Sequence, residues 1–275
     1  MRKERDPKDD CSWENHHRVP QCYLKQFLWP DGKLKVRDQE QNKIIHPKPA
    51  QIMCEKGLNH LPPETRGDMP ANILEATIFG MWDGWYPSIV LELEASDGHP
   101  DEMLARRLFQ MALGLLFRSI NGNRIMRFVA ETADDDGGLG PKTGDYPMFA
   151  GMAMMHTITK LSEHSALHLH RSTGHVRYNT CDNPTSSWIF NVESRQLSYN
   201  PHFFGKEPPD DASGGVILFP CTPDWMLEAF LNDKPFPTGF PIFMVIEAEP
   251  SHVSCANARI AEATHRFKVL APQRQ

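Results

Sequence analysis

The chain has no pair of cysteines spaced Cys-x-x-Cys, the arrangement used by zinc ribbons and thioredoxin-type redox sites. Its six cysteines are scattered instead: Cys11, Cys22, Cys54, Cys181, Cys221 and Cys255. Such scatter is typical of reduced, mostly buried thiols in a protein of the cytosol. The cysteines therefore favour neither a zinc ribbon nor a dithiol redox site.

Long apolar runs are also missing. No stretch approaches the roughly 18 apolar residues that a membrane helix needs. The charged N-terminus, MRKERDPKDDCSW, lacks the apolar segment of a signal peptide. The formal net charge of -6 disfavours a dominant nucleic-acid-binding surface, although it does not exclude a local basic groove. These features predict a cytoplasmic protein that does not bind membranes.

The common nucleotide-binding and hydrolase motifs are absent as well. Neither Gly-x-Ser-x-Gly nor Gly-x-Gly-x-x-Gly occurs, so a serine-hydrolase elbow and a Rossmann dinucleotide loop are unsupported. The segment GGLGPKTG, residues 137–144, has the composition of a phosphate-binding P-loop. However, Pro141 replaces the glycine before Lys142, and Gly144 follows Thr143. We therefore reject a P-loop here.

The chain does contain an ordered succession of secondary-structure patterns. A polar tail, residues 1–14, is expected to be disordered. The segment YLKQFLWPDGKLKVRDQEQNKIIHP predicts a hairpin with its turn at Pro30-Asp31-Gly32, and Asn42-Lys43 predicts a second turn before Ile44 and Ile45. Helical spacing predicts three helices, over 72–94, 101–131 and 148–170. From His175 onward strand patterns predominate. They are interrupted by a short helix at DWMLEAFLND and are followed by a last helix and a short strand.

This order predicts an α+β fold in one domain over residues 15–272. The expected parts are an N-terminal β-hairpin, a central helical bundle, C-terminal antiparallel strands and a final helix.

Four parts of the chain carry a family resemblance. They are HHRVPQCYLKQFLWPDGKLKVRD, GLLFRSINGNR, RYNTCDNP, and FPCTPDWML with ANARIAEATHRF. Together they resemble the domain-of-unknown-function family numbered 4238, which is found widely in bacteria. The likeness runs from residue 16 to about residue 267. It implies a shared fold and brings no activity with it.

Within the opening motif, His16, His17 and Gln21 are candidate catalytic residues. Histidine titrates near neutral pH, relays protons and binds metals. Adjacent residues of an extended segment point to opposite sides, so we expect one of the two imidazoles to face a cleft. Pro20 favours an extended Val19 and so fixes how the pair is presented. The alternative is a structural clasp that holds the N-terminus to the core.

Three further candidates come from later in the chain. Asp182 and Asn183 precede a proline at the end of a predicted strand, where binding and catalytic groups concentrate. Asp182 is a candidate catalytic residue that orients a histidine or holds a metal-bound water, and Asn183 is a candidate substrate-binding residue. An ordinary turn is the alternative for both. Arg118 is a candidate for binding a phosphate or carboxylate, the alternative being a buried ion pair with Glu75.

Two helical segments offer weaker signals. Four histidines fall in the third predicted helix: His156, His164, His168 and His170. Two of them, His164 and His168, are four residues apart, a spacing that can bind a transition metal only with further ligands. An exposed helix face is the favoured interpretation. In the last helix Arg259 and Arg266 share a face that either covers a cleft or is solvated.

The working hypothesis places His16 or His17, Gln21, Arg118 and Asp182 in one cleft. Imidazole, carboxylate and guanidinium together suit acid/base catalysis on an anionic group. This predicts a hydrolase or transferase acting on a nucleotide, a nucleic acid or another anionic substrate, with a divalent metal as an optional cofactor. The alternative is a non-catalytic binding or interaction module, in which the same residues form a structural network.

Overall fold

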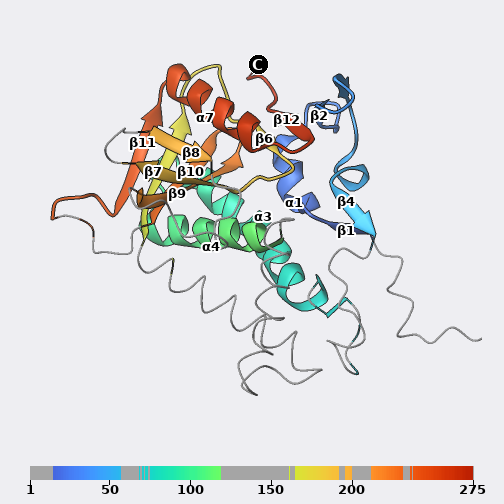
Figure 1. The fold of residues 1–275 in the computed structure, drawn as a ribbon, viewed down its shortest axis with the longest axis horizontal. Helices are drawn as coiled ribbons and strands as arrows, with labels where there is room; N and C mark the ends of the chain where they lie inside the picture. The colour runs from blue at the N-terminus through green and yellow to red at the C-terminus, as the bar shows by residue number, and fades with distance from the viewer. Residues whose placement is uncertain are drawn as a thin grey trace, which may run out of the picture.

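The centre of the structure, a computed structural model, is a six-stranded sheet with the order β11-β5-β10-β9-β7-β8 (Figure 1). Neighbouring strands are antiparallel, except that β11 runs parallel to β5. The strands are β5 (Ser165–Ser172), β7 (Ser186–Asn191), β8 (Gln196–Tyr199), β9 (Ala212–Thr222), β10 (Trp225–Leu231) and β11 (Phe243–Ala248). The residues described are 15–56, 68, 70, 72–73, 75–118, 161, 165–191, 196–199, 212–231, 236 and 238–274.

The two faces of this sheet differ in chemistry. Side chains alternate between the faces along each strand. In β5, Leu167 and Leu169 belong to the larger apolar core, so His168 and His170 project from the opposite face. The same alternation in β10 puts Glu228 on the histidine face, because its neighbours in the chain enter the larger core. One face therefore carries the main core and the other carries a group of polar side chains.

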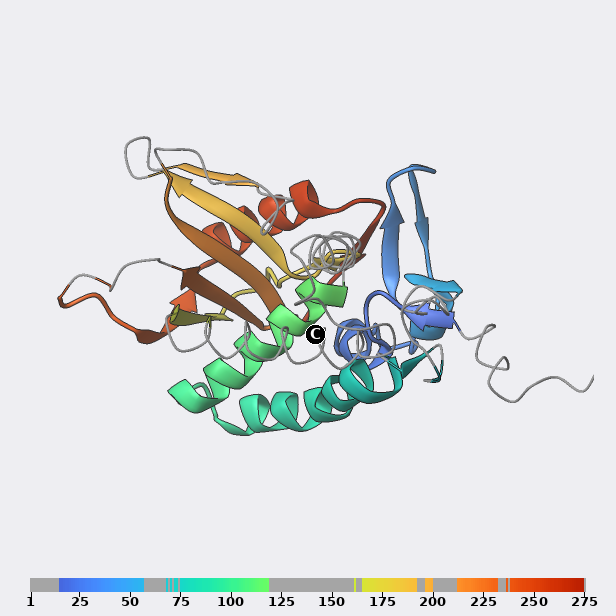
Figure 2. The ribbon, with the colours of Figure 1, turned by 60° about the horizontal axis from the view of Figure 1, so that its bottom comes forward.

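Two long helices pack side by side, and the second of them covers the leucine face (Figure 2). A π-helical segment, η4 (Glu75–Phe79), leads into α3 (Gly80–Ala95), and α4 (Glu102–Arg118) returns alongside it and packs on β5 and β10. The two helices approach closely at Gly114, where an added Cβ would lie 2.7 Å from the Trp82 ring. This contact explains why a glycine stands inside a helix despite its low helix propensity.

Helix α7 (Pro250–Ala263) covers part of the histidine face (Figure 1). Its proline at the first turn suits a helix start, because the missing N–H has no intrahelical partner there. Val253 and Ala256 pack in a second apolar cluster with Tyr178 and Trp188. The cluster fixes α7 on the sheet.

Two smaller sheets complete the described fold. The four-stranded sheet has the order β3-β2-β12-β6 and the two-stranded sheet pairs β1 with β4. Their strands are β1 (Asn15–His17), β2 (Lys35–Asp38), β3 (Lys43–Ile45), β4 (Cys54–Lys56), β6 (Thr180–Cys181) and β12 (Phe267–Leu270). Short helical turns lie between them: α1 (Gln21–Leu24), η2 (Lys25–Phe27) and η3 (Pro49–Gln51).

Tyr23 of α1 joins the N-terminal segment to both larger sheets. Its side chain is fully buried, and its hydroxyl group makes hydrogen bonds with Thr180 Oγ1 at 2.5 Å and with the carbonyl oxygen of Pro220 at 2.8 Å. The ring also stacks on Phe219. The segment just after His16 and His17 is thereby held against the core.

The α+β class, the N-terminal hairpin, the C-terminal strands and the final helix are confirmed. The hairpin is formed by β2 and β3, so it turns at the second predicted turn, near Asn42, and not at Pro30-Asp31-Gly32, which follows the helical turns over 21–27. The helix predicted over 148–170 is wrong at its end, since residues 165–170 lie in β5. The short helix predicted at DWMLEAFLND is wrong, since Trp225–Leu231 is β10. The tail over 1–14 and most of 119–164 fall outside the described residues.

Among the described residues, no helix combines the length and the apolar character needed to cross a membrane.

Candidate metal centre

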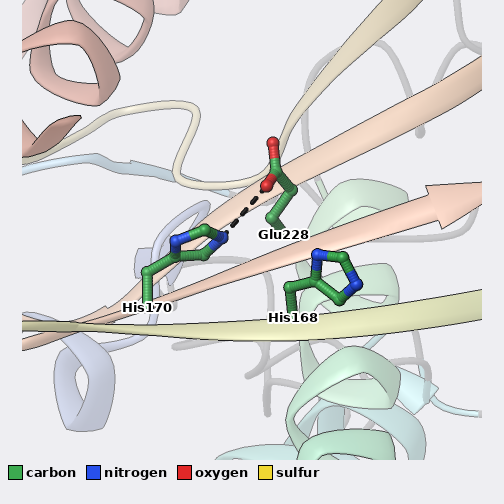
Figure 3. Close-up of side chains that lie close together, drawn as sticks. All are labelled: His168, His170 and Glu228. Atoms are coloured by element: carbon green, nitrogen blue, oxygen red, sulfur yellow. Dashed lines mark hydrogen bonds and ion pairs between the residues drawn. The ribbon is translucent and has the colours of Figure 1, made fainter. Parts of the chain in front are cut away.

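Two histidines and a glutamate meet on the histidine face of the large sheet (Figure 3). His168 of β5 and Glu228 of β10 stand directly opposite each other on adjacent antiparallel strands. His170 follows two residues later along β5, so its side chain projects from the same face. Strand register alone therefore brings three side chains together from positions almost sixty residues apart.

The three side chains are within reach of one ion. One potential ligand atom from each lies within 4.8 Å of the others. The Nε2 atom of His170 donates a hydrogen bond to Oε2 of Glu228 at 3.0 Å. His168 and His170 are only 8% and 2% exposed, so they sit in a site largely shielded from water.

Neighbouring groups hold both imidazole rings. The Nε2 atom of His168 lies 3.3 Å from the carbonyl oxygen of Pro241, which leaves Nδ1 as the nitrogen with a free lone pair. A metal-ligating histidine commonly donates its second nitrogen to a carbonyl in this way. The ring of His252, from α7, stacks on His170 with centroids 4.6 Å apart and planes inclined by 15°.

The ionisation states suit metal binding. Burial is the largest influence on Glu228 and alone would raise its pKa, but the hydrogen bond from His170 and the nearby histidines lower the pKa overall. Burial lowers the pKa of His168 and of His252. At neutral pH the site thus offers the carboxylate of Glu228 and the neutral imidazole of His168, the forms in which these groups ligate metals.

A buried polar atom beside the cluster supports a metal site. Within the described part of the chain, the hydroxyl group of Tyr178 has no hydrogen-bond partner. Nδ1 of His170 has none either, but it lies on the side of the ring that faces away from Glu228 and His168 (Figure 3). A buried unsatisfied polar group costs about 1–3 kcal/mol, so such atoms call for an explanation. Tyr178 lies close enough to Glu228 for that carboxylate to raise its pKa further, after burial. Two imidazoles and one carboxylate fit a first-row transition metal such as Zn²⁺ or Fe²⁺.

The structure groups three of the candidates predicted from the sequence in a second place, near the N-terminus. The Gln21 side-chain amide donates a hydrogen bond to Nε2 of His17 at 2.9 Å. Burial first, and then the charge of Arg118, lower the pKa of His17. Imidazole, amide and guanidinium therefore do converge between β1, α1 and the end of α4.

Arg118 is already engaged there. It is 2% exposed, and its guanidinium contacts Oδ1 and Oδ2 of Asp83 at 2.9 and 3.1 Å and also forms an ion pair with Glu75. The ion pair with Glu75 is the structural alternative that the sequence offered. With two carboxylates bound to it, the guanidinium has little capacity left for a substrate anion.

The remaining candidates take other positions. The carboxylate of Asp182 accepts backbone hydrogen bonds from His265, Arg266 and Phe267 at 3.0, 2.8 and 3.1 Å. These contacts place it at the junction of α7 and β12 and apart from the hydrogen bonds of His17. Asn183 and His16 are buried, at 7% and 1% exposure, and His16 stands opposite Glu55 in the β1–β4 pair. The catalytic and binding roles of the candidates stay predictions.

The interpretation of the sequence missed all three residues of the cluster. It favoured an exposed helix face for His168 and His170, which are buried in β5, and it did not single out Glu228. The signal for the two histidines was present, because ALHLHRS alternates apolar and polar residues with the period of two that a strand requires. Read as a helix, the segment paired His168 with His164 instead. Glu228 offered no comparable signal, since WMLEAFL is equally compatible with a short helix.

Together these features describe an α+β protein with a two-histidine, one-glutamate cluster on a sheet face. The chain belongs to the family described as "Protein of unknown function (DUF4238)", whose family model matches residues 15–271. No curated protein and no solved structure matches the chain.

Proposed function

We propose that the protein is a metal-dependent hydrolase that acts on an anionic substrate at the cluster of His168, His170 and Glu228. The observation that carries the proposal is the convergence of their ligand atoms within 4.8 Å on adjacent strands. Sites with three protein ligands leave coordination positions for water and substrate, which is the arrangement of catalytic rather than structural metal centres.

The residues of the cluster and its neighbours have different proposed roles. A divalent metal, when bound, acts as a Lewis acid and lowers the pKa of water. His168 and His170 supply nitrogen ligands, and Glu228 supplies a negative charge that offsets part of the cation. His252 is exposed, stacks on His170, and has a pKa lowered by burial. Its neutral ring is placed to accept a proton from attacking water.

The position of Arg259 is the reason for proposing an anionic substrate. It follows His252 by two turns of α7 and so lies on the same side of the helix. Its positive charge contributes to the lowered pKa of His252, after burial and His170. No ion pair engages Arg259 within the described residues, in contrast to Arg118. An uncommitted guanidinium beside a metal site suits a phosphate or carboxylate.

For the cluster at the N-terminus we propose the non-catalytic alternative. His17, Gln21 and Arg118 share a part-buried network with Asp83 and Glu75, and Asp182 makes its contacts elsewhere. The hydrogen bonds and ion pairs of this network fix how the elements that they join are arranged, although Nε of Arg118 has no hydrogen-bond partner within the described residues. The hydrolase proposal thus rests on the large sheet and not on the residues that first suggested it.

The test is metal binding together with hydrolysis. Wild-type protein, stripped with a chelator and titrated with Zn²⁺, is expected to bind about one ion per chain. His170→Ala and Glu228→Gln should weaken this affinity at least tenfold. Loss of a residue that only supports a ligand already costs about 10–100-fold, and each of these variants removes a ligand itself. The matched control is His175→Ala, an exposed histidine just beyond the same strand, which should bind Zn²⁺ as the wild type does.

The metal-loaded protein is then assayed on two anionic substrates, 4-nitrophenyl phosphate and bis(4-nitrophenyl) phosphate, with and without chelator. Activity that disappears with the chelator and in His170→Ala is expected. A wild-type protein that binds no metal, or variants that bind it equally well, would refute the proposal.

A further inference from the structure

Beside the metal ligands lies a partly exposed apolar surface, formed by Phe236, Phe240, Ile242 and Met244, which we call the aromatic platform. Ile242 is 40% and Met244 38% exposed, whereas the two phenylalanines are half-buried. Large apolar side chains gathered in one place on a surface commonly mark a binding site. This platform lies at the β11 edge of the large sheet.

The platform is continuous with the metal ligands. Met244 is the strand partner of His168 in the parallel β5–β11 pair, so both project from the same face. Phe240 stacks on His168, with ring centroids 6.2 Å apart and planes inclined by 17°. Phe236 stacks in turn on Phe240, at 5.0 Å and 14°. A row of three stacked rings, His168, Phe240 and Phe236, therefore begins at the metal ligands.

Other groups adjoin the metal ligands on two further sides. His252 of α7 lies over His170. Toward the centre of the sheet, Tyr178 and Trp188 are 0% and 2% exposed and are packed with α7 in the second apolar cluster. Among the described residues, the β11 edge is where exposed apolar side chains adjoin the ligands. A substrate ring held near the metal is therefore placed to contact the platform.

We propose that the platform binds an aromatic ring of the substrate, while the anionic group of the same molecule is held at the metal and Arg259. This deepens the proposed function and rests on it. Aromatic side chains prefer offset-stacked or edge-on ring partners, and such pairs contribute about 0.5–1.5 kcal/mol beyond the area that they bury. The thioether of Met244 adds a favourable contact with a ring. An aryl phosphate or a nucleoside phosphate has the required chemistry.

The experiment compares two stable anions that differ only in the ring. Phenylphosphonate and methylphosphonate are titrated into the Zn²⁺-loaded, full-length protein by calorimetry. Phenylphosphonate is expected to bind at least tenfold more tightly. In Phe236→Ala and in Met244→Ala the preference should fall to threefold or less, with Zn²⁺ affinity unchanged. The matched controls are Leu91→Ala and Met103→Ala, exposed apolar residues on α3 and α4, which should keep the full preference.

The outcomes separate the two proposals. If the protein binds no Zn²⁺, the metal-dependent hydrolase is refuted, and the proposed role of the platform in substrate binding is refuted as well. If Zn²⁺ binds but the two phosphonates bind equally, or neither binds, the platform alone is overturned. An unchanged preference in both Phe236→Ala and Met244→Ala also overturns it.

Discussion

At the scale of single residues, Arg118 shows how burial determines what a charge can do. The guanidinium is buried, so it must be paired, and it is paired with Asp83 and Glu75 from the segment that precedes α4. Its guanidinium carbon also lies over the ring of Phe79, 5.1 Å from the centroid. Asp83 has a pKa raised mainly by burial, an effect that the charge of Arg118 counteracts. The three charges therefore depend on one another.

Replacing Arg118 by methionine is expected to destabilise the protein by about 2–3 kcal/mol. Removing one partner of a buried ion pair typically costs about 3–5 kcal/mol, and the partial exposure of both carboxylates reduces this. The measurement is urea unfolding at pH 7. Arg106→Met, which breaks a more exposed pair with Glu102 one helical turn away, should cost about 0.5 kcal/mol or less.

A triple variant that adds Glu75→Gln and Asp83→Asn should recover part of the loss, since no carboxylate is then left unpaired. Equal costs for Arg118→Met and Arg106→Met would contradict a structural role for this network.

At the scale of elements, Asp182 joins the end of α7 to the start of β12. Its carboxylate accepts three successive backbone N–H groups, which a turn would otherwise leave without partners. Because β12 pairs with both β2 and β6, this one side chain helps to fix how α7 meets the four-stranded sheet.

Asp182→Ala should therefore lower the free energy of unfolding by about 2 kcal/mol, because three backbone donors lose their acceptor together. Zn²⁺ affinity at the large sheet should stay at the wild-type value. Asp31→Ala is the control, since Asp31 accepts a single backbone hydrogen bond in an exposed turn and its loss should have little effect. A catalytic Asp182 would give the opposite result, with stability retained and activity lost.

The sequence predicted elements best where the pattern was long or the flanking signals were strong. Helix α4 has regular apolar spacing after Pro100 and Asp101, and α7 begins at a proline. By contrast, β10 reads WMLEAFL, a short apolar run that helix and strand share equally. Its strand state comes from pairing with β5 and β9 on both sides, which is a tertiary effect that propensity does not contain.

The same limit applies to the sites. His17, Gln21 and Arg118 were expected together and are together, because two of them are neighbours in the chain and the third ends a helix that packs nearby. The His170–Glu228 contact instead depends on the register of β5 against β10. A register is set by side chains across the whole sheet and could not be read from either strand alone.

At the scale of the whole molecule, the two polar clusters share one electrostatic property. His17 in one cluster, and His168 and His252 in the other, each have a pKa lowered chiefly by burial. Folding thus holds all three imidazoles neutral. Below a pH of about 6.5, where unfolded histidine is protonated, the unfolded chain binds more protons than the folded one.

Stability should therefore fall as the pH is lowered from 7.5 to 5.5. Because the unfolded state binds more protons in this window, the free energy of unfolding rises with pH there, with a positive slope. The lowered pKa values of Glu228 and Asp224 act only at lower pH, near the ordinary carboxyl range. The raised pKa of Asp83 has the opposite sign, because it lets the folded chain bind more protons, and this one carboxyl offsets only part of the effect of three imidazoles. The measurement is urea unfolding across the range, with chelator present to keep metal binding out of the comparison.

His252→Gln should reduce the slope of the free energy of unfolding against pH, because it removes one of the three imidazoles that folding holds neutral. The matched variant His175→Gln, at an exposed position, should leave this slope unchanged. With Zn²⁺ in place of chelator the slope should steepen, since protons and metal compete for His168 and His170. Equal stability at both ends of the range would show that these imidazoles are not held neutral by the fold. It would also remove the electrostatic basis for a metal centre on the sheet.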